Sequence, residues 1–578
     1  MRRGWSAGPR LLLALVLAWP VCGAGALRVE LEGVDGELRE NIRAYLGPPP
    51  EDVGAAVLAS YQRHVQREAR RAAEALGYYA VRIQVERERS GEADWLLRLR
   101  VEPGERVRLR QVDVRVEGPA ENEPPFRALL RRLALEPGDP LHHGRYEAAK
   151  QSLRDLALAR GYFDARYRSS RVVVHPEQRA ADVELVLVSG ERYRFGQIAF
   201  SDTPFRHELL ERITPFEPGE PYHAEQVAAL TRRLNDSGYF RETQVRLDRE
   251  GAQDQQVPVN VGLKAQYPNR LSLGAGFSTD EGPRGRITWE RPWVNSYGHS
   301  LQTELRVSQV RQNITGRYRV PLDDPLNEEL NLTGGLQRER VRDTTSRQLT
   351  LGLERADVIR GGWRRAFSLR LQQESFSQGE DSASTRLILP GFSLSRTKSA
   401  GGLDVDRGHR WSFNVEAAER RLLSDISLVR LRAATKWLFP LGGRHRFQTR
   451  ADAGVLTSSD FDQVPASLRF FAGGDQSVRG FGFQSIAPRD ADGELVGGRY
   501  LLTGSLEYQY EVLERWRLAL FTDSGSAFDD PAGADYAVGS GFGLRWVSPV
   551  GPVRLDFAWG VSEPDTPFRV HFSMGPAL

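Results

Sequence analysis

The 578-residue chain contains one cysteine, Cys22, and only four lysines, so nearly all of its positive charge is arginine. Because Cys22 lies within the first 26 residues, a mature chain that begins after them has no disulfide, no thiol nucleophile and no thiolate metal site. No later stretch reaches about 18 consecutive apolar residues, which excludes transmembrane helices from that mature chain. The formal net charge is +3. Such a near balance argues against a nucleic-acid binder, which usually concentrates basic charge.

The first 26 residues have the features of a secretory signal peptide. Arg2 and Arg3 precede the apolar run Leu11–Trp19, which is too short to span a bilayer. Ala24–Ala26 then provides a small-x-small cleavage site. We therefore expect residues 1–26 to be removed and the remainder to be exported.

The first half of the chain contains an internal repeat. Three helix-like stretches end in glycine followed by two aromatic residues, at Gly77, Gly161 and Gly238, about 80 residues apart. A second motif recurs as LEPGDPL and FEPGEPY. Glycine commonly terminates helices, and alternating apolar residues follow it as strands. The pattern predicts three α+β units of order β-α-α-β-β, at residues 27–103, 104–189 and 190–264.

From about residue 265 the apolar residues alternate with polar ones. In one strand-like run Val553, Leu555, Phe557 and Trp559 alternate with Arg554, Asp556 and Ala558, and in another Phe568, Val570 and Phe572 alternate with Arg569, His571 and Ser573. One apolar and one charged face fit either a half-solvated sheet or a membrane β-barrel with a wet lumen.

Length favours the barrel. At about 20 residues per strand with its turn, residues 265–578 correspond to about 16 antiparallel strands, an even number as such barrels require. Eleven strand-like runs precede Leu456 and five follow Arg499. Seven tryptophans lie near inferred strand ends, where membrane interfaces belong: Trp289, Trp293, Trp363, Trp411, Trp437, Trp516 and Trp546. The segment 458–498 does not alternate, and a loop of this length is usually functional.

No catalytic arrangement emerges from the residues. The glycines of Gly539–Gly543 lack the spacing of a nucleophile elbow or a dinucleotide loop. The pair His142-His143 lacks the further ligands of a metal site. We therefore expect neither an enzyme, nor a metal, nor a cofactor.

Two signatures carry a resemblance to a known family. The repeats resemble POTRA domains, and Val478-Arg479-Gly480-Phe481 resembles the lumenal-loop motif of the BamA/TamA superfamily of outer-membrane assembly factors. The longer string GGDQSVRGFGFQSIAP looks like the TamA branch, and so does the number of repeats, since BamA carries five and two-partner secretion transporters carry two.

The resemblance implies a place and a task. It implies the outer membrane of a Gram-negative bacterium, with the POTRA-like units in the periplasm. It also implies energy-independent insertion or translocation of β-barrel and autotransporter clients, by edge-strand templating and lateral opening of the barrel seam. The implied partners are those clients, outer-membrane lipids and a TamB-like periplasm-spanning protein anchored in the inner membrane. A secretion channel for a soluble protein, or the outer-membrane end of a lipid-transport bridge, are the alternatives.

The resemblance also implies two sets of site residues. The long loop folds into the lumen, where the motif arginine binds acidic residues on the strands that follow it. The barrel opens at the seam between its first and last strands, about Arg270–Ser278 and Phe568–Gly575. The implied loop residues are Val478, Arg479, Gly480 and Phe481 with the anchoring partners Glu507, Asp523 and Phe521, and the seam residues are Gly274, Gly276, Phe572 and Gly575.

Overall fold

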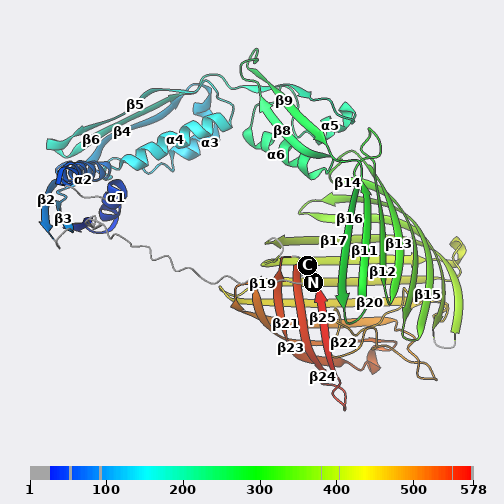
Figure 1. Ribbon diagram of the computed structural model, residues 1–578. Helices are drawn as coiled ribbons and strands as arrows, with labels where there is room; N and C mark the ends of the chain where they lie inside the picture. The colour runs from blue at the N-terminus through cyan, green and yellow to red at the C-terminus, as the bar shows by residue number, and fades with distance from the viewer. Residues whose placement is uncertain are drawn as a thin grey trace, which may run out of the picture. The chain divides into compact units, whose positions relative to one another are not determined.

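The computed structural model describes residues 27–50, 55–89, 94–378, 381–401, 404–549 and 551–574. The expected signal peptide and Gly575 lie outside these ranges. Three small α+β repeats precede a β-barrel (Figure 1). The chain forms two compact units, of which the first holds the first two repeats and short segments of the third. The second unit joins Ile198–Glu217, Gln226–Asp248 and Val259–Leu578.

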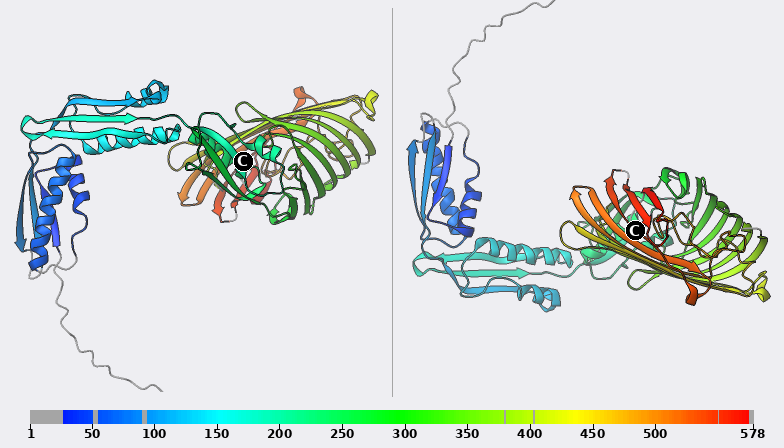
Figure 2. Two further views of the ribbon diagram at one scale, coloured as in Figure 1. Left: turned by 90° about the horizontal axis from the view of Figure 1, so that it is seen from above. Right: turned by 90° about the horizontal axis from the view of Figure 1, so that it is seen from below.

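Each repeat has the predicted order β-α-α-β-β. The last strand of each repeat lies at the centre of a three-stranded sheet. In the first two repeats it runs parallel to the first strand and antiparallel to the second, and the helices cover one face of the sheet (Figures 1 and 2). The elements of repeat one are β1 Leu27–Glu32, α1 Gly36–Leu46, α2 Ala55–Ala75, β2 Arg82–Arg89 and β3 Trp95–Glu102; those of repeat two are β4 Arg108–Glu117, α3 Pro124–Leu130, α4 His143–Ala159, β5 Arg166–His175 and β6 Ala180–Val188; those of repeat three are β7 Arg194–Phe200, α5 His207–Ile213, α6 Ala224–Asp236, β8 Phe240–Leu247 and β9 Gln256–Ala265. Short 3₁₀ turns at Pro119–Asn122 and Pro176–Gln178 join elements of repeat two.

The two motifs that recur in the sequence meet in space. A Cβ on Gly77 would lie 2.5 Å from the Leu141 carbonyl oxygen, and a Cβ on Gly161 would lie 2.9 Å from the Tyr222 Cβ. Both glycines have positive φ, which other residues rarely adopt. Leu141 and Tyr222 end the two copies of the second motif. The helix end of one repeat therefore packs against the turn of the next, and this close approach requires glycine.

The third repeat packs against the turns at one end of the barrel. The Tyr239 hydroxyl, whose residue is 1% exposed, donates to the Gly298 carbonyl at 2.8 Å. Arg233 forms an ion pair with Asp324 at 3.0 Å, and the Arg206 N–H donates to the Ser296 carbonyl. Among the described helices, none combines the length and apolar content that crossing a membrane demands.

The second half is a closed barrel of sixteen strands in which neighbours along the chain pair in antiparallel order. Eleven strands precede the long loop and five follow it, as the alternation predicted. The strands are β10 Arg270–Ser278, β11 Gly282–Arg291, β12 Ser300–Ser308, β13 Arg311–Pro321, β14 Glu328–Val341, β15 Thr344–Ile359, β16 Trp363–Gln378, β17 Asp381–Ala400, β18 Arg407–Ala418, β19 Leu428–Pro440, β20 His445–Ser458, β21 Tyr500–Leu513, β22 Trp516–Phe528, β23 Ala537–Ser548, β24 Gly551–Gly560 and β25 Phe568–Met574, with 3₁₀ turns at Arg420–Leu422 and Pro531–Gly533.

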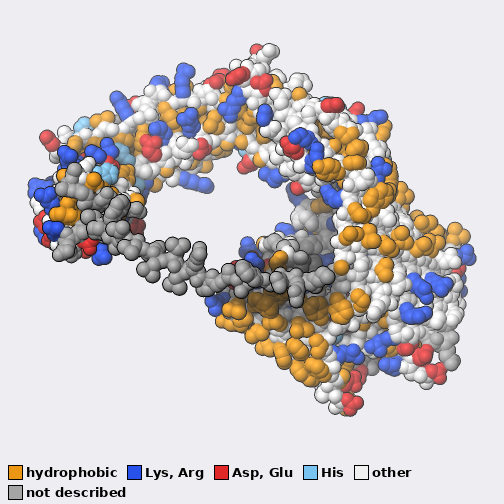
Figure 3. Space-filling view, in the orientation of Figure 1, with side chains coloured by type: hydrophobic (Ala, Val, Ile, Leu, Met, Phe, Trp, Pro, Cys, Tyr) orange, Lys and Arg blue, Asp and Glu red, His pale blue; other side chains and the backbone are white. Residues whose placement is uncertain are grey.

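The barrel is apolar outside and polar inside. Leucines such as Leu336, Leu351 and Leu369 are about half exposed on the outer wall, whereas Glu507 and Asp523 are buried inside. Figure 3 shows hydrophobic side chains spread over the outer wall. A water-soluble sheet would bury the leucines and expose the carboxylates, so this distribution is that of a wall facing lipid and a lumen facing water.

The tryptophans of the strands gather at one border of this wall. β10 begins after the third repeat, so the even-numbered strands start, and the odd-numbered strands end, at the repeat-proximal border. Six tryptophans lie there: Trp289, Trp363, Trp411, Trp437, Trp516 and Trp546. Trp559 lies toward the opposite end of β24. The structure thus has a tryptophan girdle at the border nearest the third repeat.

Candidate functional site

The long segment between β20 and β21, residues 459–499, is the lumenal loop of this barrel. Its apolar residues Val464, Leu468 and Phe470 are buried against inward-facing residues of several strands, among them Leu387 and Leu456. Its polar residues bind the wall as well, since the Ser467 backbone N–H donates to the Glu374 carboxylate. The loop therefore fills part of the lumen and is held there by both apolar packing and hydrogen bonds.

Arg479 is the most heavily bonded residue of the loop. Its Nε and Nη2 donate to the two carboxylate oxygens of Asp523 at 2.7 and 2.9 Å, and its backbone N–H donates to the same carboxylate at 3.0 Å. Its Nη1 donates to Glu507 at 2.7 Å. The guanidinium carbon lies 3.4 Å from the ring centroid of Phe521. This fork-to-carboxylate geometry is specific to arginine.

The three implied partners are therefore all in contact with Arg479, and two further residues complete the cluster. Arg545 binds Glu507 at 2.8 Å and Asp556 at 2.6 Å, and Asp556 also lies 3.4 Å from Arg479 Nη1. The side chains of these groups are at most 8% exposed. In such a site each charge is stabilised chiefly by its partners rather than by water.

Burial and the surrounding carboxylates act in opposite directions on the Arg479 guanidinium. Burial lowers its pKa, but the hydrogen bonds and charges of Asp523, Glu507 and Asp556 outweigh burial and raise the pKa above its usual value. Arg479 therefore stays positively charged in the folded loop.

Glycines open the space that the motif occupies. A Cβ on Gly539 would lie 1.8 Å from the Arg479 carbonyl oxygen, and a Cβ on Gly480, at φ 93°, would lie 2.7 Å from the Trp559 carbonyl carbon. Val478 is fully buried and Phe481 is 8% exposed. The loop backbone thus lies directly on the inner faces of β23 and β24, where larger side chains would displace it.

Between the described residues of β10 and β25, strand pairing at the seam is short. Among the described residues of the two strands, the register contains the single pair Ser278 with Ser573. Next to it the Thr279 N–H donates to the Phe572 carbonyl at 3.4 Å. On its other edge β10 is registered with β11 from Arg270 to Ser278. The predicted seam strands do meet, where the last residue of β10 pairs with a residue near the end of the described part of β25.

Phe572 lies at the seam itself, and two of the predicted seam glycines lie on the first strand, β10. Phe572 lies beside Thr279, with its ring centroid 6.1 Å from that of Phe277. Gly274 and Gly276 lie on the lumenal face of β10, where a Cβ at Gly274 would have ordinary contacts only.

The lumenal loop also binds both sides of the seam. The Asp475 N–H donates to the Asp280 carboxylate at 2.7 Å, and Asp280 belongs to the turn that follows β10. The Gly480 N–H donates to Nε2 of His571 on β25 at 3.1 Å, while His571 Nδ1 lies 3.7 Å from Asp280. Burial and the Asp280 carboxylate raise the pKa of Asp475 to about 6.

Asp280, His571, Arg545 and Asp556 were not among the residues implied by the resemblance. A signal for two of them is present in the sequence, since the alternation of the last two strands already places Asp556 and His571 on the polar, lumen-facing side. Their contact with the loop depends on how far the loop folds back, which alternation does not encode.

The fold and the site together define an outer-membrane β-barrel protein with periplasmic POTRA domains. Residues 267–577 match the Omp85 superfamily domain, residues 28–103 match the POTRA domain TamA domain 1, and residues 112–190 and 193–265 match the POTRA surface antigen variable number repeat. Because the first of these matches covers more than half of the chain, the chain belongs to the Omp85 superfamily.

Individual proteins show the same similarity. The outer membrane protein assembly factor BamA of Nitratidesulfovibrio vulgaris is 23% identical over 452 residues, which are 73% of this chain and 56% of the relative, so the chain spans little more than half the length of that relative. The chloroplastic outer envelope protein 80 of Arabidopsis thaliana is 33% identical over 117 residues, 18% of this chain and 14% of the relative. The crystal structure of BamA from Haemophilus ducreyi lacking POTRA domains 1–3 has the same fold, with a TM-score of 0.69, 14% identity and coverage of 81% of this chain and 99% of the other.

Proposed function

We propose that this protein inserts β-strand-rich clients into the outer membrane by offering the edge of β10 as a template. The observation that carries the proposal is the seam. Among the described residues, Arg270–Phe277 of β10 have no registered partner on β25. An unpaired backbone group in hydrocarbon costs several kcal/mol, so a client strand that pairs with this edge removes a cost for both chains.

Strand length supports the same site of action. β10, β11 and β12 beside the seam have 9, 10 and 9 residues, whereas β16 and β17 on the far side of the barrel have 16 and 20. Shorter strands present a lower apolar wall, and a bilayer thins where it meets one. A thinned bilayer beside the seam lowers the barrier to inserting a client strand.

The position of the third repeat supports delivery of client chains to the first strand of the barrel. Its contacts with Gly298 and Asp324 fix it to the turns between β11 and β12 and between β13 and β14, close to the first strand. Strand edges of such a sheet can accept an extended client chain by β-augmentation. We propose that clients, including autotransporter barrels, pass from this repeat to the edge of β10.

The lumenal loop favours assembly over secretion. A channel for a soluble protein must clear its lumen, whereas here Arg479, Val464 and Phe470 anchor the loop against the wall. We propose that the cluster around Arg479 holds the loop so that Asp475 and Gly480 can position the two seam strands. The TamA-type first repeat supports a further proposal, that a TamB-like inner-membrane protein binds the periplasmic domains.

A disulfide across the seam tests this function. The variant Ser278→Cys/Ser573→Cys joins the registered pair, and Ser272→Cys/Thr288→Cys staples β10 to β11 as a matched control that leaves the seam free. Full-length protein in liposomes is given a urea-unfolded autotransporter barrel, and the folded client is measured by its heat-modifiable mobility on gels.

We expect the oxidised seam variant to stop client folding, reductant to restore it, and the control to match the wild type in both states. Full activity of a verified seam crosslink contradicts templating by β10. Ion conductance of the same liposomes separates the alternatives, because a secretion channel conducts and this plugged barrel should not. Loss of lipid rather than client transfer in the crosslinked variant would favour the lipid-bridge alternative.

A further inference from the structure

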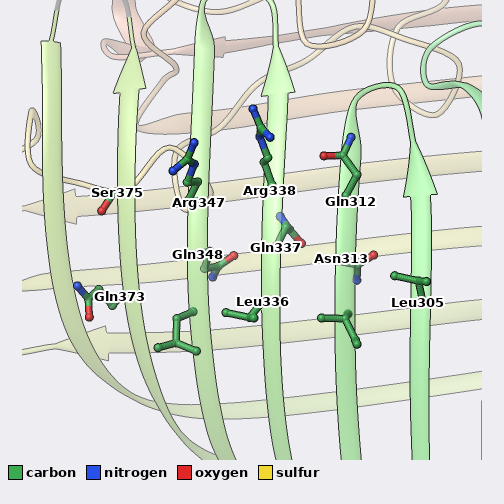
Figure 4. A pocket seen from close by; sticks show the side chains of 12 residues that line it. Leu305, Gln312, Asn313, Leu336, Gln337, Arg338, Arg347, Gln348, Gln373 and Ser375 are labelled. Atoms are coloured by element: carbon green, nitrogen blue, oxygen red, sulfur yellow. The ribbon is translucent and has the colours of Figure 1, made fainter.

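The outer wall of the β14–β15 hairpin carries two arginines that face each other. Arg338 on β14 is registered with Arg347 on β15, and both are exposed. Gln312 on β13 is the neighbour of Arg338, and Ser375 on β16 is the neighbour of Arg347. These side chains line one groove, and Arg338, Arg347 and Gln312 lie at similar height on adjacent strands (Figure 4).

The groove continues directly into the apolar wall. Leu336 and Leu349 are the next outward residues on the same two strands, with 56% and 44% exposure, and Leu305 and Ile314 extend the row. Because residues of one parity share a face, the arginines mark the point at which the hydrocarbon-facing band ends. The turn after β14 lies at the end of the barrel opposite the third repeat, so this is the border with the outer leaflet.

Two opposed like charges destabilise a sheet unless a counter-charge is bound. Within the part of the chain that the structure describes, neither Arg338 nor Arg347 has an ion pair with a carboxylate. Glu339, the acidic neighbour in sequence, faces the lumen and binds Arg311 at 2.7 Å. The positive charges of Arg338 and Arg347 are therefore not neutralised by any carboxylate in the described part of the chain.

The opposite border of the same strand is built differently. Arg355 on β15 is separated from Arg347 by three outward leucines, Leu349, Leu351 and Leu353. Its neighbour on the same face, Asp357, forms an ion pair with Arg365 at 2.6 Å. The arginines near the periplasm thus have acidic neighbours, whereas those at the outer border lack them.

We propose that this groove binds the phosphorylated sugar headgroup of an outer-leaflet glycolipid, whose acyl chains lie along the leucine row below it. Guanidinium groups bind phosphate through paired hydrogen bonds, and strands in register bring two of them within reach of one headgroup. The Gln312 side-chain nitrogen donates to the Ser308 carbonyl at 2.9 Å, which leaves its amide oxygen to accept hydrogen bonds from sugar hydroxyls. A protein partner could bind the two arginines but would not contact the leucines, which face the hydrocarbon of the membrane. A lipid can bind the arginines with its headgroup and contact the leucines with its acyl chains.

The simplest competing account is that both arginines extend into water at the membrane surface, as long cationic side chains do at interfaces. That account predicts no preference among lipids. Ours predicts a preference for the number of phosphates on the headgroup and a requirement for acyl chains.

The test uses the full-length protein in detergent and native mass spectrometry with three lipid probes: bis-phosphorylated lipid A, monophosphoryl lipid A and phosphatidylethanolamine. The variant Arg338→Gln/Arg347→Gln removes the pair. The control Arg355→Gln/Arg360→Gln removes the same charge near the periplasmic border, where Arg360 is exposed directly after β15. Heat-modifiable mobility verifies that each variant is folded, and the single Arg347→Gln variant replaces the double one if that fails to fold.

We expect the wild type and the control to retain bis-phosphorylated lipid A, and the groove variant to bind it about 10- to 100-fold more weakly, as the loss of charge-assisted hydrogen bonds predicts. Equal retention by the groove variant, or equal binding of all three probes, overturns the proposal. Displacement of lipid A by inorganic phosphate also overturns it, because the acyl chains would then contribute nothing.

Discussion

The contact between Arg479 and Asp523 offers a sharp test of how the lumenal loop is held. Of the two acidic partners of Arg479, Asp523 is the better one to test. Glu507 has a second partner, Arg545 at 2.8 Å, which still neutralises it when Arg479 is lost. Asp523 instead receives three hydrogen bonds from Arg479 itself, from the backbone N–H, Nε and Nη2. Either single change therefore leaves a buried charge without its main partner.

The expected cost follows from burial. The side chains of Arg479 and Asp523 are 4% and 0% exposed, so removing one partner should cost about 3–5 kcal/mol of unfolding free energy. An exposed pair would contribute at most about 1 kcal/mol. We expect Arg479→Ala and Asp523→Ala each to lower the unfolding free energy by about 3–5 kcal/mol. The loss in the double variant should be about 1–3 kcal/mol smaller than the sum of the two single losses, as is typical of residues in contact.

Denaturant unfolding in detergent, followed by tryptophan fluorescence, measures all four proteins of the cycle. Arg489→Ala is the matched control, since Arg489 is an exposed arginine of the same loop and should change the stability by no more than about 0.5 kcal/mol. Arg479→Lys should be destabilised as well, because an ammonium cannot bond both Asp523 oxygens as the guanidinium does. Additive single effects, or a lysine variant equal to the wild type, would refute the paired geometry.

Further predictions concern the seam latch, the repeat contact and the topology. Because the pKa of Asp475 is raised to about 6, the folded loop binds this proton more tightly than the unfolded chain does. Loop docking should therefore gain stability as the pH falls from about 7 to about 5, and Asp475→Asn should abolish that gain in melting curves at the two pH values. Tyr239→Phe should cost about 1 kcal/mol by removing the hydrogen bond to Gly298, and Gly298→Ala should cost more because its Cβ would lie 2.7 Å from the Tyr239 hydroxyl; differential scanning calorimetry measures both, and equal small effects would contradict this packing. Gly539→Ala should release the loop to protease in detergent, since its Cβ would overlap the Arg479 carbonyl, and an unchanged cleavage rate would show that the wall can yield. Protease added to intact cells should leave residues 27–264 uncut, and trimming of this segment would contradict a periplasmic location.

The period of the apolar residues was sufficient to predict most of the architecture. A strand has only two faces, so alternation placed Asp556 and His571 on the polar, lumen-facing side before any pairing was known. Glycine followed by two aromatic residues likewise marked the helix ends of three α+β repeats. These features are local, since each depends on residues a few positions apart.

The seam and the loop cluster depended on the tertiary structure. Ser278 and Ser573 are nearly 300 positions apart, and their pairing follows from the tilt and closure of sixteen strands rather than from any local pattern. In the same way, Arg545 and Asp556 join Arg479 only because the glycines of β23 and β24 let the loop approach the wall. Local periodicity determined which way each side chain points, and closure of the barrel determined which of them meet.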